Sequence, residues 1–230
     1  DQAASAAAAH KLYPGCAPST HNRAVFAPAI AILRLSGLRP DIRRPKIQKA
    51  PPRVPHDGWF DALLPHCSPE LAALIVFLTL TGRRIGEALQ AIDNGDGTAT
   101  IGKTKTGSPV VVAIPGLCRK LLGKAERGNR LFYYADRWSV RNALKAACKR
   151  AKVDYYGTHS LGRHAFATRL LKEGWSVKHV AAAGGWASPR LVLERYGHLE
   201  RSEIADAVKK LGQSWGKKRK IARKSQKFGV

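Results

Sequence analysis

The sequence SPELAALIVFLTLTG, residues 68–82, predicts a buried helix at the centre of a globular domain. Ser68 is a residue type that caps helix N-termini, and proline is favoured at the first helical position. The run from Leu71 to Leu80 is apolar around nearly the whole circumference of a helix, which is typical of a helix enclosed by other elements. Gly82 then ends the helix. The run is too short to cross a bilayer, so we expect no membrane segment.

The residues that follow predict a mainly α-helical domain with a small antiparallel β-sheet, an α+β fold. A second helix is expected in residues 83–89, and the sequence DNGDG at residues 93–97 is a strong turn signal. Residues 98–101 and 110–114 are rich in β-branched and apolar residues, which predicts paired strands. Beyond them the pattern is helical, and helices are expected at residues 117–124, 138–151, 159–172, 177–182, 189–196 and 202–211.

The chain before residue 56 is predicted to form two parts. Residues 2–12 and 21–35 favour helices, but they contain too few apolar residues for an independent core. We therefore expect residues 1–38 to be the C-terminal part of a small helical domain that begins upstream of Asp1. Residues 39–55 follow as a basic linker, because their X-Pro pairs resist helix formation. Its basic side chains could follow a phosphate backbone or be merely solvated, and we favour a solvated linker whose side chains also bind DNA: Arg43, Arg44, Lys46, Lys49 and Arg53.

The charge of the chain indicates what kind of partner it binds. There are 40 Lys and Arg residues against 16 Asp and Glu, a net charge of +24. A positive field of this size predicts a polyanionic partner, with nucleic acid favoured over an anionic membrane. The basic tail at residues 213–230 is expected to bind DNA, and a solubilising role is the alternative. Its densest run is Lys217, Lys218, Arg219 and Lys220.

The four cysteines indicate a reducing compartment. Cys16, Cys67, Cys118 and Cys148 are widely separated, and none has a second cysteine or a histidine at metal-ligand spacing. We therefore expect reduced thiols, no zinc site and a cytoplasmic protein. The sequence also lacks a Walker-type phosphate loop and an obvious cluster of metal-binding carboxylates, so neither a nucleotide nor a metal cofactor is expected.

Tyr196 is the residue around which a reaction could be organised. It ends the helix expected at residues 189–196, after Gly184-Gly185-Trp186 and before His198. A tyrosine hydroxyl has a pKa of about 10 and is a poor nucleophile. To attack a phosphodiester it needs cations on the phosphate, a group that accepts its proton, and an acid for the departing alkoxide. Without these groups a packing role is the better interpretation.

Three other segments offer those groups. Arg84 begins a helix just after a glycine, and Glu87 lies on the same face, where it can orient the guanidinium or form only a surface ion pair. Lys105, near the tip of the predicted hairpin, is a candidate proton donor, in competition with Lys103; a solvated turn lysine is the alternative. A second pair, His159 and Arg163, is four residues apart and so shares a helix face, although such a pair also occurs by chance.

Taken together over residues 56–212, these segments resemble the tyrosine recombinases, the phage-integrase family of site-specific recombinases. TGRRIGEAL at residues 81–89 is similar to the family's first-arginine box, IGKTKTG at residues 101–107 to its β-hairpin box, and RHAFAT at residues 163–168 to its second-arginine box. The resemblance implies a catalytic domain preceded by the remnant of a helical core-binding domain. It assigns catalytic roles to Arg84, Lys105, His159, Arg163, Trp186 and Tyr196, with Glu87 and His164 in support.

Two spacings depart from the family pattern. The family usually has its histidine three residues before the second arginine, whereas His159 precedes Arg163 by four. It commonly has nine residues' separation between the His or Trp and the nucleophile, whereas Tyr196 follows Trp186 by ten. The second difference falls at the turn Ala187-Ser188-Pro189. Both departures keep the required residue types.

The resemblance implies an enzyme that breaks and rejoins double-stranded DNA through a covalent intermediate, without metal or ATP. Arg84 and Arg163 would hold the nonbridging oxygens of the scissile phosphate, and Tyr196 would form a 3′-phosphotyrosyl link. Lys105 would protonate the leaving 5′-oxygen, with His159 as the proton acceptor. A homo-tetramer on DNA and a prokaryotic or phage origin are implied by the family alone. The alternatives are a non-catalytic DNA-binding module, with a helix-turn-helix in residues 176–196, and a type IB topoisomerase.

Overall fold

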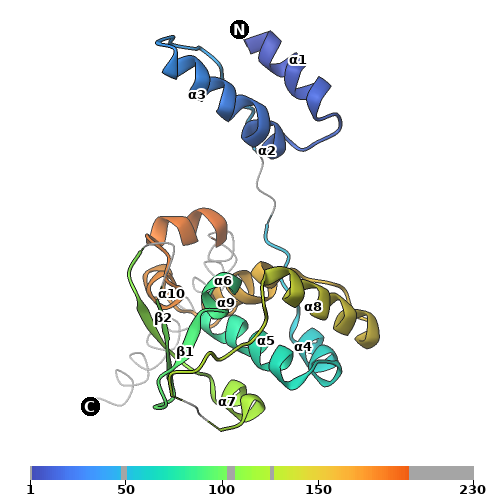
Figure 1. Ribbon diagram of the computed structural model, residues 1–230, viewed down its shortest axis with the longest axis vertical. Helices are drawn as coiled ribbons and strands as arrows, with labels where there is room; N and C mark the ends of the chain where they lie inside the picture. Colours follow the sequence, from blue (N-terminus) through green and yellow to red (C-terminus); the bar gives the residue numbers. More distant parts are fainter. Residues whose placement is uncertain (1, 48–50, 103–106, 125–126, 197–230) are drawn as a thin grey trace, which may run out of the picture. The chain divides into compact units, whose positions relative to one another are not determined.

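The computed structural model describes residues 2–47, 51–102, 107–124 and 127–196 (Figure 1). It divides the chain into two compact units, residues 1–50 and 51–230, and each unit is described by itself. In the described ranges, no helix is both long enough and apolar enough to cross a membrane.

The first unit is a small helical hairpin. Helix α1 spans Gln2–Leu12, and a second helical run consists of α2 (Pro18–His21), a π-helical turn η1 (Asn22–Phe26) and α3 (Ala27–Leu35). Its core is small: Ala9, His21, Phe26 and Ile30 are buried. The extended chain after α3 is attached to these helices, because Asn22 Nδ2 donates to Pro45 O at 2.9 Å and Arg43 N to Gln2 Oε1 at 2.7 Å.

Helix α5 (Pro69–Thr81) is the central element of the second unit, as the sequence predicts. Ser68 Oγ caps it by accepting a hydrogen bond from Leu71 N at 3.3 Å, and all residues from Leu71 to Thr79 are buried. Gly82 ends the helix in the left-handed conformation, with φ of 64°. A helix buried on every side must be covered by other elements, so the rest of the unit forms around α5.

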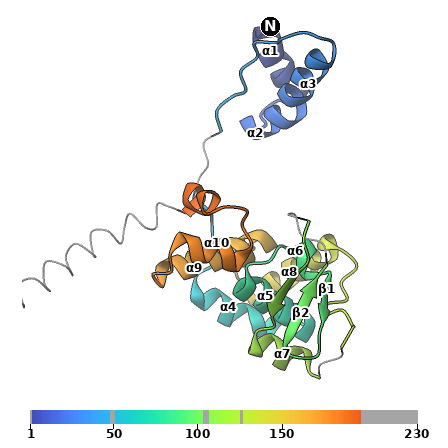
Figure 2. The ribbon, with the colours of Figure 1, turned by 90° about the vertical axis from the view of Figure 1, so that its left-hand side faces the viewer.

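Helices surround α5 on several sides (Figures 1 and 2). It packs against α7 (Gly116–Leu122), α8 (Arg137–Ala151) and α9 (Ala165–Lys172). Helix α4 (Asp57–Leu63) and the short 3-10 turn η2 (Leu64–His66) pack on α8. Buried Trp59 joins α4 to the segment that follows α8, since its Nε1 donates to Asp154 O at 2.8 Å.

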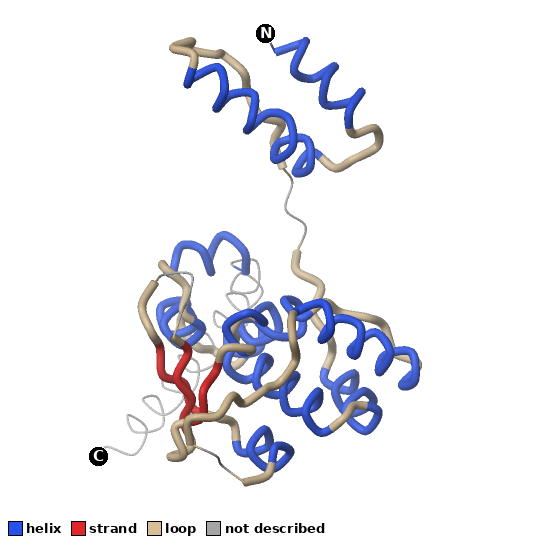
Figure 3. The backbone as a smooth tube through the Cα atoms, viewed as in Figure 1, coloured by secondary structure: helices blue, strands red, loops and turns tan. Residues whose placement is uncertain are grey.

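The sheet has three antiparallel strands, β1 (Ala91–Asp93), β2 (Thr98–Ile101) and β3 (Val110–Ala113), in that order (Figure 3). The hairpin of β2 and β3 confirms the prediction, with Ile101 opposite Val110. Strand β1 was not predicted, because three residues before a turn give too short a pattern. One face of the sheet is buried, through Ala91, Ala99, Ile101 and Val112.

Helix α6 and the C-terminal helices differ in detail from the sequence prediction. The helix expected at residues 159–172 begins with a π-helical turn, η3 (Ser160–His164), before α9. The helix expected at residues 83–89 is only α6 (Ile85–Ala88). Helix α10 spans Val177–Gly184, and residues 189–196 are helical. The helix expected at residues 202–211 lies outside the described residues.

These helices form a second apolar cluster of the same unit. It contains Ala167 and Leu171 of α9, Val180 and Ala181 of α10, and Val192 and Tyr196. Packing of α9 on α5 links this cluster to the main core. Tyr196 is therefore part of the packed interior that positions the C-terminal helices.

Candidate active site

Arg84 lies at the N-terminus of α6, where a sharp turn brings it out of α5. Gly82 makes that turn: besides its positive φ, a Cβ there would lie 2.5 Å from Phe166 Cδ1, so only glycine fits without strain. Arg84 N donates to Glu87 Oε2 at 3.0 Å, and Arg84 Nη1 donates to Glu87 Oε1 at 2.7 Å. The predicted support of Arg84 by Glu87 is thus present as two hydrogen bonds.

The two members of this ion pair differ in exposure. The side chain of Glu87 is 7% exposed and that of Arg84 is 33% exposed. Burial alone raises the pKa of Glu87, but the hydrogen bonds from Arg84 and the charges of Arg84 and Arg163 outweigh it and lower the pKa. Glu87 is therefore a buried carboxylate that fixes one edge of the Arg84 guanidinium and leaves its other edge accessible.

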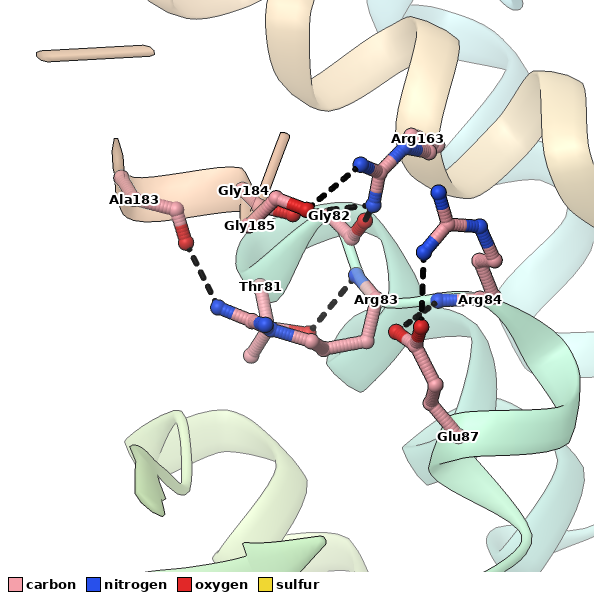
Figure 4. A network of polar contacts seen from close by, with 9 residues as sticks. All are labelled: Thr81, Gly82, Arg83, Arg84, Glu87, Arg163, Ala183, Gly184 and Gly185. Carbon is pink, nitrogen blue, oxygen red and sulfur yellow. Dashed lines mark hydrogen bonds and ion pairs between the residues drawn. The ribbon is translucent and has the colours of Figure 1, made fainter. Parts of the chain in front are cut away.

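Arg163, in η3, is buried and bound by backbone carbonyls (Figure 4). Its Nη1 donates to Gly82 O at 3.2 Å and to Gly184 O at 2.9 Å, and its Nη2 donates to Gly185 O at 3.1 Å. Burial, reinforced by the charge of Arg84, lowers the pKa of Arg163 to about 10, so the guanidinium is charged at neutral pH. These bonds join the end of α5, the end of α10 and η3.

Trp186 contacts the side chains of both Arg163 and Tyr196. The Arg163 Cζ atom is 3.8 Å from the centroid of the Trp186 ring, a cation–π contact. The centroids of the Trp186 and Tyr196 rings are 6.4 Å apart, and the ring planes make an angle of 89°. The ten-residue separation of Trp186 and Tyr196 therefore leaves the two side chains adjacent.

The hydroxyl of Tyr196 is hydrogen bonded to His164 in the interior. Tyr196 is 1% exposed, and its Oη lies 2.5 Å from His164 Nδ1. Burial raises the pKa of Tyr196 to about 12, against the opposing charges of Arg163 and Arg195. Burial and the neighbouring His159, Arg195 and Arg163 lower the pKa of His164 to about 4. At neutral pH the tyrosine is thus protonated, and its O–H donates to a neutral imidazole.

The π-helical turn places His159 against His164. A π-helical turn closes its hydrogen-bonded ring over one residue more than an α-helical turn does. The His159 and His164 rings, five positions apart, are 4.6 Å apart and perpendicular. Desolvation, together with the charges of Arg163, Arg84 and Arg195, lowers the pKa of the exposed His159. His159 directly precedes η3, and Arg163 lies within it.

The remaining predicted site residues fall in three groups. Arg43, Arg44 and Lys46 are exposed on the first unit. Arg53 belongs to the second unit, where it pairs with Asp154 at 3.0 Å and lies 5.2 Å above the ring of Tyr156. The last group lies outside the described residues: Lys49, Lys103, Lys105, Lys217, Lys218, Arg219 and Lys220.

Helix α8 has a basic face that was not predicted from the sequence. Arg137, Arg141, Lys145 and Lys149 are exposed and follow one another at four-residue spacing, on a helix without acidic residues. Arg137 and Arg141 also lie 4.9 and 5.5 Å from the ring of the half-exposed Trp138. Like charges at this spacing destabilise a helix, so the face suits a polyanion that neutralises them. The four-residue repeat was a signal that could have been found.

Arg83 is a further residue for which the sequence predicted no role. It is 7% exposed, and its Nη2 donates to Ala183 O at 2.8 Å. Figure 4 shows Arg83, Arg84 and Arg163 side by side around the ends of α5 and α10. No local signal separates a buried arginine from an exposed one in the run Arg83-Arg84.

The lowered pKa of His164 predicts a loss of stability in mild acid. In the unfolded chain His164 has its ordinary pKa of 6.5 and binds a proton below that pH. In the folded chain its pKa is about 4, so it binds the proton only near pH 4. Stability that is present above pH 6.5 is therefore lost as the pH falls toward 4, by up to about 3 kcal/mol. Melting temperatures measured from pH 7.5 to 4.5 should fall less steeply for His164→Gln than for the exposed control His66→Gln. Equal slopes would contradict the assignment.

The chain belongs to the phage integrase family, whose sequence pattern matches residues 61–203. The fold is shared with solved structures of that kind. The catalytic domain of bacteriophage HP1 integrase is 27% identical, with a TM-score of 0.53; the match covers 68% of this chain and 93% of that one. Comparison with curated proteins returns no significant match.

Two more distant structures were solved with DNA and share the fold. XerH recombinase, in a post-cleavage complex with palindromic difH substrate, is 18% identical with a TM-score of 0.62, over 91% of this chain and 72% of that one. The Tn1549 transposon integrase, in complex with transposon right end DNA, is 14% identical with a TM-score of 0.66, over 90% and 85%. This chain is accordingly a site-specific recombinase of the tyrosine type.

Proposed function

We propose that this recombinase cleaves DNA with Tyr196 as the nucleophile and Arg84 and Arg163 as the phosphate clamp. The observation that carries the proposal is the contact of the Tyr196 hydroxyl with His164, one residue from an arginine stacked on Trp186. Segments far apart in the sequence supply these groups, and a DNA-binding module without chemistry has no need of that convergence. The arrangement supports a phosphoryl transfer in which the protein positions the reactants and stabilises charge.

In the proposed reaction, Tyr196 Oη attacks the scissile phosphorus and the bond to the 5′-oxygen breaks. The products are a 3′-phosphotyrosyl link and a free 5′-hydroxyl, so the phosphodiester is conserved for rejoining. Arg163 has N–H groups beyond the three bound to carbonyls, and Arg84 has an edge beyond that held by Glu87. A guanidinium fork of this kind suits two phosphate oxygens. Lys105 is kept as the proton donor to the 5′-oxygen.

The pKa values restrict how the tyrosine loses its proton. With Tyr196 at about 12 and His164 at about 4, complete proton transfer before attack costs on the order of 10 kcal/mol. The proton therefore leaves as the bond to phosphorus forms and the hydroxyl becomes acidic. His164 accepts it, and the exposed His159, packed against the His164 ring, exchanges it with water. In this proposal His164 takes the acceptor role that the sequence predicted for His159, and His159 is the second member of a relay.

The wider assignments are part of the same proposal. Residues 56–212 form the catalytic domain, residues 1–38 belong to a helical DNA-clamp domain, residues 39–55 link the two, and residues 213–230 form a basic tail. The α8 face and the basic residues of the linker bind the DNA backbone, which neutralises their charge. Assembly of four subunits on DNA and action in the cytoplasm complete the proposal.

A nicked suicide substrate tests the function. Because the fragment released next to the cleaved phosphate diffuses away, the covalent adduct should accumulate as a denaturation-resistant band, and peptide mapping should locate the DNA on Tyr196. Tyr196→Phe should form none, whereas the exposed control Tyr133→Phe should react as the wild type does. An adduct on Tyr196→Phe would refute the nucleophile, and DNA binding without any adduct would favour a binding module. Relaxation of plasmids that lack a recombination site would instead favour a topoisomerase.

A further inference from the structure

The C-terminal turn of α10 is bound by two arginines from different parts of the chain (Figure 4). The last carbonyls of a helix have no partner within the helix and form the negative end of its dipole. Arg83 binds Ala183 O, and Arg163 binds Gly184 O and Gly185 O. Three successive carbonyl groups are thus satisfied by guanidinium groups, which is favourable because the cations lie at the negative end.

The glycines of this turn allow the arginine and the indole to approach it closely. A Cβ at Gly185 would lie 2.7 Å from Arg83 Nη1, and Gly185 has a positive φ of 66°. A Cβ at Gly184 would lie 1.8 Å from the ring of Trp186. The turn is therefore in close contact with both Arg83 and Trp186. A shift of Arg83 would release the turn and the indole that follows it.

Arg83 is held there at an energetic cost. Among the described residues, its Nε is buried without a hydrogen-bond partner, and such an unsatisfied polar group costs roughly 1–3 kcal/mol. Burial lowers the pKa of Arg83, and the opposing charge of Glu87, a carboxylate hydrogen bonded to Arg84, does not outweigh it. An apolar side chain of similar length would avoid this cost, so packing alone does not account for an arginine at this position.

We propose that Arg83 is a positioning residue for strand cleavage, an inference that rests on the proposed function. By holding Ala183 O it fixes the turn that follows. That turn places Gly184 O and Gly185 O as acceptors for Arg163, and it places the Trp186 ring against the Arg163 guanidinium. Arg83 therefore sets the direction of the free Arg163 N–H groups on the scissile phosphate. It acts on the rate of cleavage and leaves DNA affinity unchanged, because its own guanidinium is buried against protein.

Single-turnover cleavage of the suicide substrate at saturating DNA tests this inference. Arg83→Met, which keeps the length and removes the donors, should slow adduct formation by about 10- to 100-fold, the effect of misplacing a clamp by about 1 Å. The DNA dissociation constant should stay within about threefold of the wild type. Arg83→Lys should recover part of the rate, since an ammonium still reaches one carbonyl. The matched control is Arg190→Met, an 84% exposed arginine on the helix of Tyr196.

A second measurement separates positioning from a structural role. The ratio of cleavage rates on phosphate and methylphosphonate at the scissile position reports the charge contact made by the clamp. This ratio should fall for Arg83→Met and Arg83→Lys and stay unchanged for Arg190→Met. An unchanged rate and ratio in Arg83→Lys and Arg83→Met, or a rate loss with an unchanged ratio, would overturn the inference. Failure of the wild type and Arg190→Met to form any adduct would instead refute the proposed function.

Discussion

Arg84→Ala should lower the rate of covalent adduct formation by about 10³-fold or more, the range found for arginines that stabilise a transferring phosphoryl group. The Arg84 side chain is one-third exposed, and Glu87 holds only one edge of its guanidinium. The main effect of the substitution is therefore loss of the contact with phosphate. DNA affinity should fall little, because most of it comes from many separate phosphate contacts. Single-turnover cleavage and equilibrium binding on the same DNA measure the two effects.

The buried Glu87 requires a control in that experiment. The Glu87 side chain is 7% exposed in the wild type. Without the Arg84 guanidinium, this carboxylate keeps the hydrogen bond from the backbone N–H of residue 84 and loses its charged partner. Arg84→Ala should therefore also lower the melting temperature, and adding Glu87→Gln should restore it without restoring cleavage. Recovery of cleavage in the double variant would mean that Arg84 acts by neutralising Glu87 and does not contact the phosphate.

Arg163→Ala should abolish cleavage and destabilise the fold at the same time. Its three carbonyl bonds join Gly82, Gly184 and Gly185, and their loss leaves acceptors unsatisfied in a packed region. A loss of about 3 kcal/mol in unfolding free energy is expected. For a domain of this size that corresponds to a fall of roughly 6–12 °C in melting temperature.

The conservative variant distinguishes the two roles of Arg163. Arg163→Lys keeps a charge and one or two of the carbonyl bonds, so it should regain much of the stability. Cleavage should remain low, because an ammonium cannot hold the turn and grip two phosphate oxygens together. An Arg163→Ala protein as stable as the wild type would show that the carbonyl bonds do not hold the end of α10 in place.

Local spacing accounts for what the sequence predicts correctly. The apolar run of α5, the hairpin of β2 and β3, and the pairing of Arg84 with Glu87 each depend on residues close together in the chain. Patterns with a fixed period or offset report on one element and its near neighbours. The central helix and the orientation of Arg84 could therefore be found without a structure.

The contacts between segments could not be found in this way. The α-helical spacing suggests that His159 pairs with Arg163, but the π-helical turn η3 sets it against His164. The partner of Tyr196, 32 positions away, is fixed by how the helix at residues 189–196 packs on α9. Buried Arg83 depends on the end of α10, 100 positions away. Each result follows from packing, which a residue pattern does not encode.

The carbonyl groups at the end of α10 explain how a highly basic protein can keep several guanidinium groups together before its substrate arrives. Peptide dipoles stabilise Arg83 and Arg163 but carry no net charge. Carboxylates in their place would cancel the charge of Arg83 and Arg163 and repel an incoming phosphate. These two arginines are therefore fixed by dipoles and keep their positive charge, whereas Arg84 is paired with the Glu87 carboxylate. Little reorganisation is then required when the phosphate enters.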